Sequence, residues 1–143
     1  MEREFVSYEQ AVALKKIGFD KPCFKYIYTG DTGTNCNHYL EVEPQKAKNY
    51  NEDYLCISQP LFSQVFRWFR ENHGLEIILR PDCFNHESKK LREYVIISYD
   101  KSWKLEAIAE PSHFVRKGCF NTPEEAENAC IDKLIELAKQ QSK

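Results

Sequence analysis

The chain has 143 residues, of which 29% are charged and 13% are aromatic, with five glycines and six prolines. This length suits one domain with its own core, and the composition is not that of a disordered chain. The formal net charge of -2 excludes a general electrostatic attraction to nucleic acid or to anionic membranes. We therefore expect one folded domain over residues 1–143, in which nucleic-acid binding would need a local basic patch.

A helix is predicted from Ser7 to just before Gly18. Ser7 and Gln10 have the spacing of a capping box, in which each side chain bonds the backbone amide of the other residue. Gly18 can adopt the left-handed conformation that ends a helix, and Phe19 is placed for the hydrophobic contact of a Schellman motif. Pro22 then directs the chain into an extended segment.

Two strands are predicted next, in residues 24–28 and 38–42. Alternation puts Phe24, Tyr26 and Tyr28 on one face of the first strand, and the turn-rich segment TGDTGTN between the strands predicts a hairpin. Residues 43–54 are polar and aperiodic, and we interpret them as a long mobile loop.

A second helix is predicted to begin near Ser58, with Pro60 in its first turn, and to end at Gly74, because apolar residues recur at helical spacing between them. The segment LEIIL that follows at 75–79 predicts a strand. Residues 91–99 and 103–109 predict a second hairpin through a short turn at 100–102.

The C-terminal segment predicts a short strand near 114–116 and then a helix. Thr122 and Glu125 have capping-box spacing, and Pro123 lies at the first helical position. The apolar stripe expected on this helix consists of Ala126, Cys130, Ile131, Leu134, Ile135 and Leu137.

The predicted order of elements is α-β-β-α-β-β-β-α. Strands joined by short turns pair antiparallel, and helices with one apolar face need a sheet to cover. We therefore predict an α+β fold, a two-layer sandwich with a mainly antiparallel sheet and about three helices. A repeated helix-plus-hairpin unit is the alternative, although no residue pattern repeats clearly.

The sequence also predicts the localisation of the protein and the redox state of its cysteines. We find no secretory signal pattern and no stretch approaching the roughly 18 apolar residues that cross a bilayer, so we expect a cytoplasmic protein with no membrane partner. The six cysteines are scattered without a Cys-x-x-Cys pair, which predicts reduced thiols that are mostly buried.

Few residues have the spacing of a metal or catalytic site. Only Cys83 and His86 approach the spacing of a zinc knuckle, and the acidic residues at 41, 43, 52 and 53 lack the regular spacing of a calcium loop. No nucleophile motif and no phosphate-binding loop is present. We therefore expect no metal, no cofactor and no enzymatic activity.

The segment FRWFRENHG contains the strongest candidate for a binding surface. Arginines and a tryptophan within one helical turn could grip phosphates and stack on bases, and the basic segment KKLR could extend the patch. The alternative is that the tryptophan packs at the edge of the core and the arginines are solvated. The candidate binding residues are Arg67, Trp68, Arg70, Lys89, Lys90 and Arg92.

Three segments, VSYEQAVALKKIGFDKPC, ISQPLFSQVFRWFRE and FNTPEEAENACIDKLIELAK, resemble a family of small proteins carried by bacterial phages, prophages and other mobile elements. The resemblance covers most of the chain apart from its loops. It implies an intracellular accessory protein and no particular activity, cofactor or catalytic residue. We expect a non-catalytic protein-interaction module with a protein partner. The alternative is a nucleic-acid-binding accessory factor.

Overall fold

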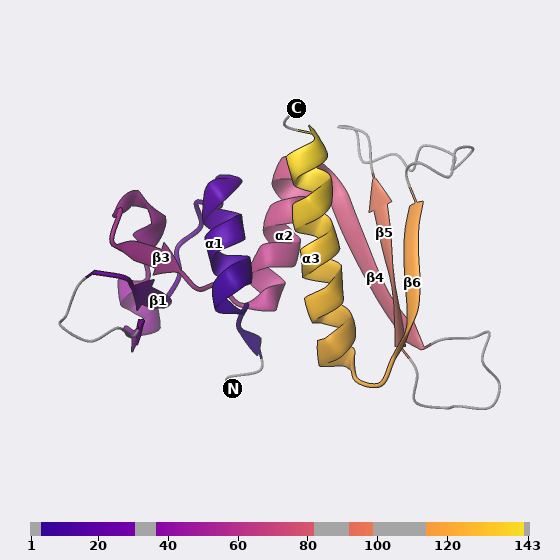
Figure 1. The fold of residues 1–143 in the computed structure, drawn as a ribbon, viewed down its shortest axis with the longest axis horizontal. Helices are drawn as coiled ribbons and strands as arrows, with labels where there is room; N and C mark the ends of the chain where they lie inside the picture. Colours follow the sequence, from indigo (N-terminus) through magenta and orange to yellow (C-terminus); the bar gives the residue numbers. More distant parts are fainter. Residues whose placement is uncertain (1–3, 31–36, 82–91, 99–113, 142–143) are drawn as a thin grey trace. The chain divides into compact units, whose positions relative to one another are not determined.

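A computed structural model of the chain describes residues 4–30, 37–81, 92–98 and 114–141 (Figure 1). Its contacts divide the chain into two compact units, which we call the N-terminal unit (Met1–Val65) and the C-terminal unit (Phe66–Lys143). Helices and antiparallel sheets make up both, so the predicted α+β class is confirmed. The expectation of a single domain stays a prediction.

In its described residues the N-terminal unit contains one helix, a three-stranded sheet, two short 3-10 helices and the first turn of a second helix, α2 (Phe62–His73). The other elements are α1 (Tyr8–Lys16), β1 (Lys25–Tyr28), β2 (His38–Glu41), η2 (Pro44–Lys46), η3 (Tyr50–Glu52) and β3 (Cys56–Ser58). The sheet has the order β2-β1-β3, and both of its pairings are antiparallel. The predicted hairpin of the first two strands is therefore confirmed.

Both ends of α1 form as predicted. The Gln10 amide donates to the Ser7 hydroxyl over 3.2 Å, and the Ser7 amide donates to the Gln10 side chain over 3.0 Å. At the other end Gly18 has a φ of 91°, and the Phe19 amide donates to the Leu14 carbonyl over 3.0 Å, which completes the Schellman motif. These bonds satisfy backbone groups that a helix end otherwise leaves unpaired.

The start of the second helix differs from the prediction. Helix α2 (Phe62–His73) begins four residues after Ser58, which instead belongs to the unpredicted strand β3. The hydroxyl of Ser58 accepts a hydrogen bond from the Tyr50 amide over 3.0 Å, so it does not cap a helix. A three-residue strand is too short for its periodicity to be recognised in the sequence. The predicted end is confirmed, since Gly74 has a φ of 62°.

The C-terminal unit holds a second three-stranded antiparallel sheet of order β4-β5-β6. Its elements are β4 (Leu75–Pro81), β5 (Arg92–Ser98), β6 (Phe114–Phe120) and α3 (Pro123–Gln141). Helix α3 contacts all three strands and forms a second layer over them (Figure 1). The short strand predicted near 114–116 is confirmed and longer than expected, whereas the predicted strand at 103–109 lies outside the described residues. A helix is followed by an antiparallel pair of strands twice, as α1-β1-β2 and α2-β4-β5. The third strand, however, joins the first strand of one pair and the second strand of the other, so the alternative of a repeated unit stays a prediction.

Helix α3 begins at the predicted cap with one change of partner. The Glu125 amide donates to the Thr122 hydroxyl over 3.1 Å, but the Glu125 carboxylate accepts from the Asn121 amide over 2.9 Å rather than from that of Thr122. Leu137 is only partly buried, whereas the other predicted stripe residues are all buried. Ala138, which the stripe did not include, is buried as well. None of the helices among the described residues is long and apolar enough to cross a membrane.

Candidate functional site

The sheet of the N-terminal unit has one buried face and one partly exposed face. Lys25 and Ile27 of β1 are 9% and 0% exposed, whereas Tyr26 and Tyr28 between and after them are partly exposed. The ammonium of Lys25 lies 3.3 Å from the Glu41 carboxylate, which reduces the cost of its burial. The two tyrosines therefore lie on the face of β1 that is accessible to other molecules.

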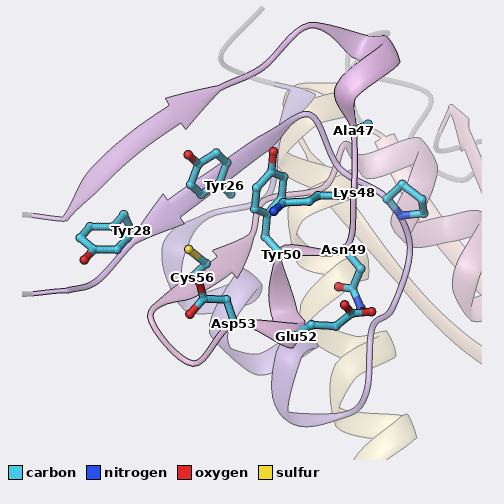
Figure 2. A pocket seen from close by; sticks show the side chains of 10 residues that line it. Tyr26, Tyr28, Ala47, Lys48, Asn49, Tyr50, Glu52, Asp53 and Cys56 are labelled. Carbon is cyan, nitrogen blue, oxygen red and sulfur yellow. The ribbon is translucent and has the colours of Figure 1, made fainter.

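An open pocket with a volume of about 810 Å³ lies over this tyrosine face (Figure 2). It is formed by Tyr26 and Tyr28 of β1, by Cys56 of β3, by Pro22, and by every residue of the segment 47–53 except Asn51. We call it the tyrosine pocket. All of these residues belong to the N-terminal unit.

Two tyrosine rings from different segments stack in the tyrosine pocket. The ring centroids of Tyr26 and Tyr50 lie 3.9 Å apart, with an angle of 10° between the ring planes. The ammonium of Lys48 lies 5.0 Å from the centroid of the Tyr50 ring, and Figure 2 shows its side chain reaching toward that ring. Because the Tyr50 amide donates to Ser58 of β3, the stack is fixed to the sheet.

The wall of the pocket is the segment that the sequence predicted as a mobile loop. The structure ties this segment to other parts of the chain by hydrogen bonds, and its mobility stays a prediction. Cys23 and Lys48 exchange two backbone hydrogen bonds of 2.9 and 3.3 Å. The Asn51 side chain donates to the Phe19 carbonyl over 2.8 Å and accepts from the Ser58 amide over 2.9 Å. These bonds reach residues far along the chain, so periodicity within residues 43–54 could not reveal them.

The charged residues near the tyrosine pocket divide into paired and unpaired groups. Glu43 lies 3.0 Å from the ammonium of Lys46. Glu52 and Asp53 are exposed and line the pocket, and neither forms an ion pair within the described part of the chain. The ammonium of Lys15 donates to the Asp53 carbonyl over 2.8 Å.

The hydrogen bonds of the two pocket carboxylates are few. One carboxylate oxygen of Asp53 accepts from the Leu55 amide over 2.9 Å. Glu52 accepts a long bond of 3.5 Å from the Asn49 side chain. Each carboxylate therefore has an oxygen that can accept further hydrogen bonds from a ligand.

The cysteine in the pocket is a poor nucleophile. Burial raises the pKa of the Cys56 thiol, and the negative charge of Asp53 raises it further. A raised pKa leaves the thiol protonated near neutral pH, and the thiolate is the reactive form. Burial also raises the pKa of Cys23 to about 12. Within the described ranges no three His, Cys, Asp or Glu residues gather in a way that could hold a metal ion.

The tryptophan of the sequence-predicted binding surface is buried in the structure. Trp68 is only 3% exposed, and its ring meets Phe69 and His73 edge-on at centroid distances of 5.1 and 4.8 Å. A ring that is covered in this way has no face on which a base could stack. This placement agrees with the alternative considered for Trp68, namely that it packs with the core.

The arginines beside Trp68 are engaged with carboxylates of the same unit. Arg67 is exposed and lies 2.7 Å from Glu71, one helical turn away. Arg70 lies 3.1 Å from Glu76 of β4. Such exposed pairs contribute little to stability, but they compete with any phosphate for the guanidinium groups.

The other basic residues of the predicted surface are not placed beside this helix. Lys89 and Lys90 lie outside the described residues, and Arg92 is described only as the first residue of β5, opposite Phe120 of β6. Of the six predicted binding residues, Arg67, Trp68 and Arg70 have described side chains, and these three lie on the same helix. A basic patch that joins all six stays a prediction.

Comparison with protein-family models, with curated proteins and with solved structures finds no match for this chain.

Proposed function

We propose that the chain is a non-catalytic protein-interaction module that binds an extended segment of a partner protein in the tyrosine pocket. The observation that carries the proposal is an open pocket of about 810 Å³ whose tyrosine rings are held by the sheet and by an anchored wall. This volume lies in the range of roughly 300 to 1,000 Å³ that is typical of binding pockets.

The residue types of the tyrosine pocket support recognition of a peptide. Tyrosine offers a large contact area and a hydroxyl at a low cost in conformational entropy, and it is enriched in protein interfaces. The stacking of Tyr26 on Tyr50 fixes both rings before a ligand arrives, so less entropy is lost on binding.

The chemistry of the pocket favours binding over catalysis. The only thiol in its lining belongs to Cys56, whose raised pKa disfavours the nucleophilic form. In the context that the sequence resemblance implies, the module acts in the cytoplasm of a bacterial cell as an accessory protein of a phage or other mobile element. Its partner is then a protein of that element or of the host.

The proposal is tested by selection from a displayed library of random peptides on the immobilised full chain. Ala47, a partly exposed residue of the pocket lining, is replaced by tryptophan so that the new ring fills the pocket. The matched control is Lys46→Trp, which adds the same ring on the neighbouring exposed residue outside the lining.

We expect the selection to enrich peptides that bind the wild-type chain and the Lys46→Trp variant but do not bind the Ala47→Trp variant. The bound peptides should be recovered chemically unchanged. Failure to enrich any peptide, equal binding to both variants, or cleavage of the peptides would each contradict the proposal.

A further inference from the structure

The rings of the tyrosine pocket suit a cationic ligand. The face of an aromatic ring carries negative charge density, so an ammonium or guanidinium group within about 6 Å of its centroid is attracted to it. The chain already uses this geometry, since the ammonium of Lys48 lies 5.0 Å from the centroid of Tyr50. Tyr28 also lines the pocket, and no described cation lies over its ring.

The unpaired charges of the pocket point to the same ligand chemistry. Its lining contains the carboxylates of Glu52 and Asp53 and the ammonium of Lys48, so the carboxylates are in excess. The nearby ammonium of Lys15 is held by two backbone carbonyls, those of Asp53 and Cys56, at 2.8 and 2.6 Å. An anionic ligand would therefore meet two carboxylates that have no ion pair among the described residues, whereas a cationic ligand would pair with them.

An arginine side chain matches both features of the pocket better than a lysine. Its planar guanidinium can lie flat on a tyrosine ring and still donate several hydrogen bonds in that plane. The carboxylates of Glu52 and Asp53 each retain accepting capacity beyond the bonds they make to Asn49 and Leu55. We infer that the tyrosine pocket binds an arginine side chain of an extended segment in the partner protein, an inference that rests on the proposed function.

The test compares dye-labelled Gly/Ser peptides that differ only in one central residue. The peptides carry arginine, its neutral isostere citrulline, or glutamate, and the anisotropy of the dye is measured as the full chain is added. We expect the arginine peptide to bind about tenfold more tightly than the citrulline peptide, since a partly exposed cation–π contact and a charge-assisted hydrogen bond together contribute on that scale. Equal affinities for arginine and citrulline, or preference for glutamate, would overturn the inference.

Charge variants of the pocket provide a second test with opposite expected signs. Glu52→Gln and Asp53→Asn remove attraction for a cation, so each should weaken binding of the arginine peptide severalfold. Lys48→Met removes a competing cation and should strengthen it. Glu9→Gln, an exposed carboxylate on α1 outside the pocket, is the matched control and should change nothing.

The reverse signs in the arginine-peptide titration would show that the pocket does not recognise a cation. If Lys48→Met weakens binding and the carboxylate variants strengthen it, the inference is wrong. The library selection separates this failure from failure of the proposed function. Enriched peptides that lack arginine but need an open pocket would keep the interaction module and overturn only the arginine inference.

Discussion

Asn51 connects the wall of the tyrosine pocket to two other segments, and its replacement by alanine gives the sharpest test of that architecture. The side chain donates to the Phe19 carbonyl over 2.8 Å and accepts from the Ser58 amide over 2.9 Å. Phe19 and Ser58 are 2% and 1% exposed, whereas Asn51 itself is partly exposed, so water can replace the lost amide only in part. We expect the loss of these two hydrogen bonds to cost about 1 to 3 kcal/mol in total.

Hydrogen exchange measured by NMR is the suitable assay for Asn51→Ala. The free energy of opening of the slowest amides in β1 reports on the N-terminal unit, whereas tryptophan fluorescence would report on Trp68 and Trp103, which both belong to the other unit. Gln45→Ala is the matched control, because among the described residues that side chain bonds the exposed Glu43 carboxylate alone, and the change should alter stability by less than about 0.5 kcal/mol. A loss below about 0.5 kcal/mol in Asn51→Ala would refute the reasoning.

Three further predictions concern stability. Leu134→Ala on α3 should lower the free energy of unfolding by about 2 to 5 kcal/mol in chemical denaturation, because the side chain is fully buried; a neutral result would place that face in solvent. Gly18→Ala should lower the melting temperature, at a cost of about 1 kcal/mol, because its φ is 91°; an unchanged melting temperature would contradict the Schellman ending. Burial raises the pKa of Cys23 from 9.0 to about 12, so only the unfolded chain ionises between these values; stability should fall as pH rises through that interval, and less steeply in Cys23→Ala.

The features that the sequence predicted correctly depend on residues close together in the chain. The capping pair Ser7 and Gln10, the helix end at Gly18 and the cap at Thr122 each act within one helical turn. Their geometry is imposed by local backbone chemistry, so a single sequence is enough to read them.

The features that the sequence missed depend on distant partners. Strand β3 exists because it pairs with β1, and the wall of the pocket is tied to another segment because Asn51 reaches Phe19, 32 residues away. Alternation placed Tyr26 and Tyr28 on one face of their strand, but it could not say that Lys25 and Ile27 would face the core. The only signal of the pocket was this pair of tyrosines, and a third, Tyr50, lay in a segment without periodicity.

The predicted binding helix illustrates the same limit on a candidate site. A tryptophan between two arginines is typical of a surface that binds nucleic acid. The same residues also occur where a tryptophan packs at the edge of the core and the arginines beside it are solvated. The two alternatives differ only in which face of the helix is covered. Trp68 is 3% exposed, so this residue packs with the core. Tyr26 and Tyr50 were not candidates, because nothing in the sequence brings them within 3.9 Å.

The central claim, that the tyrosine pocket receives an arginine side chain, is tested most directly by the ring-proton NMR signals of Tyr26, Tyr28 and Tyr50. During titration of the full chain with the arginine peptide, these signals should shift in a saturable way, and the citrulline peptide should leave them almost unchanged at the same concentration. Stationary tyrosine signals while residues elsewhere in the chain shift, or equal shifts with both peptides, would contradict the account.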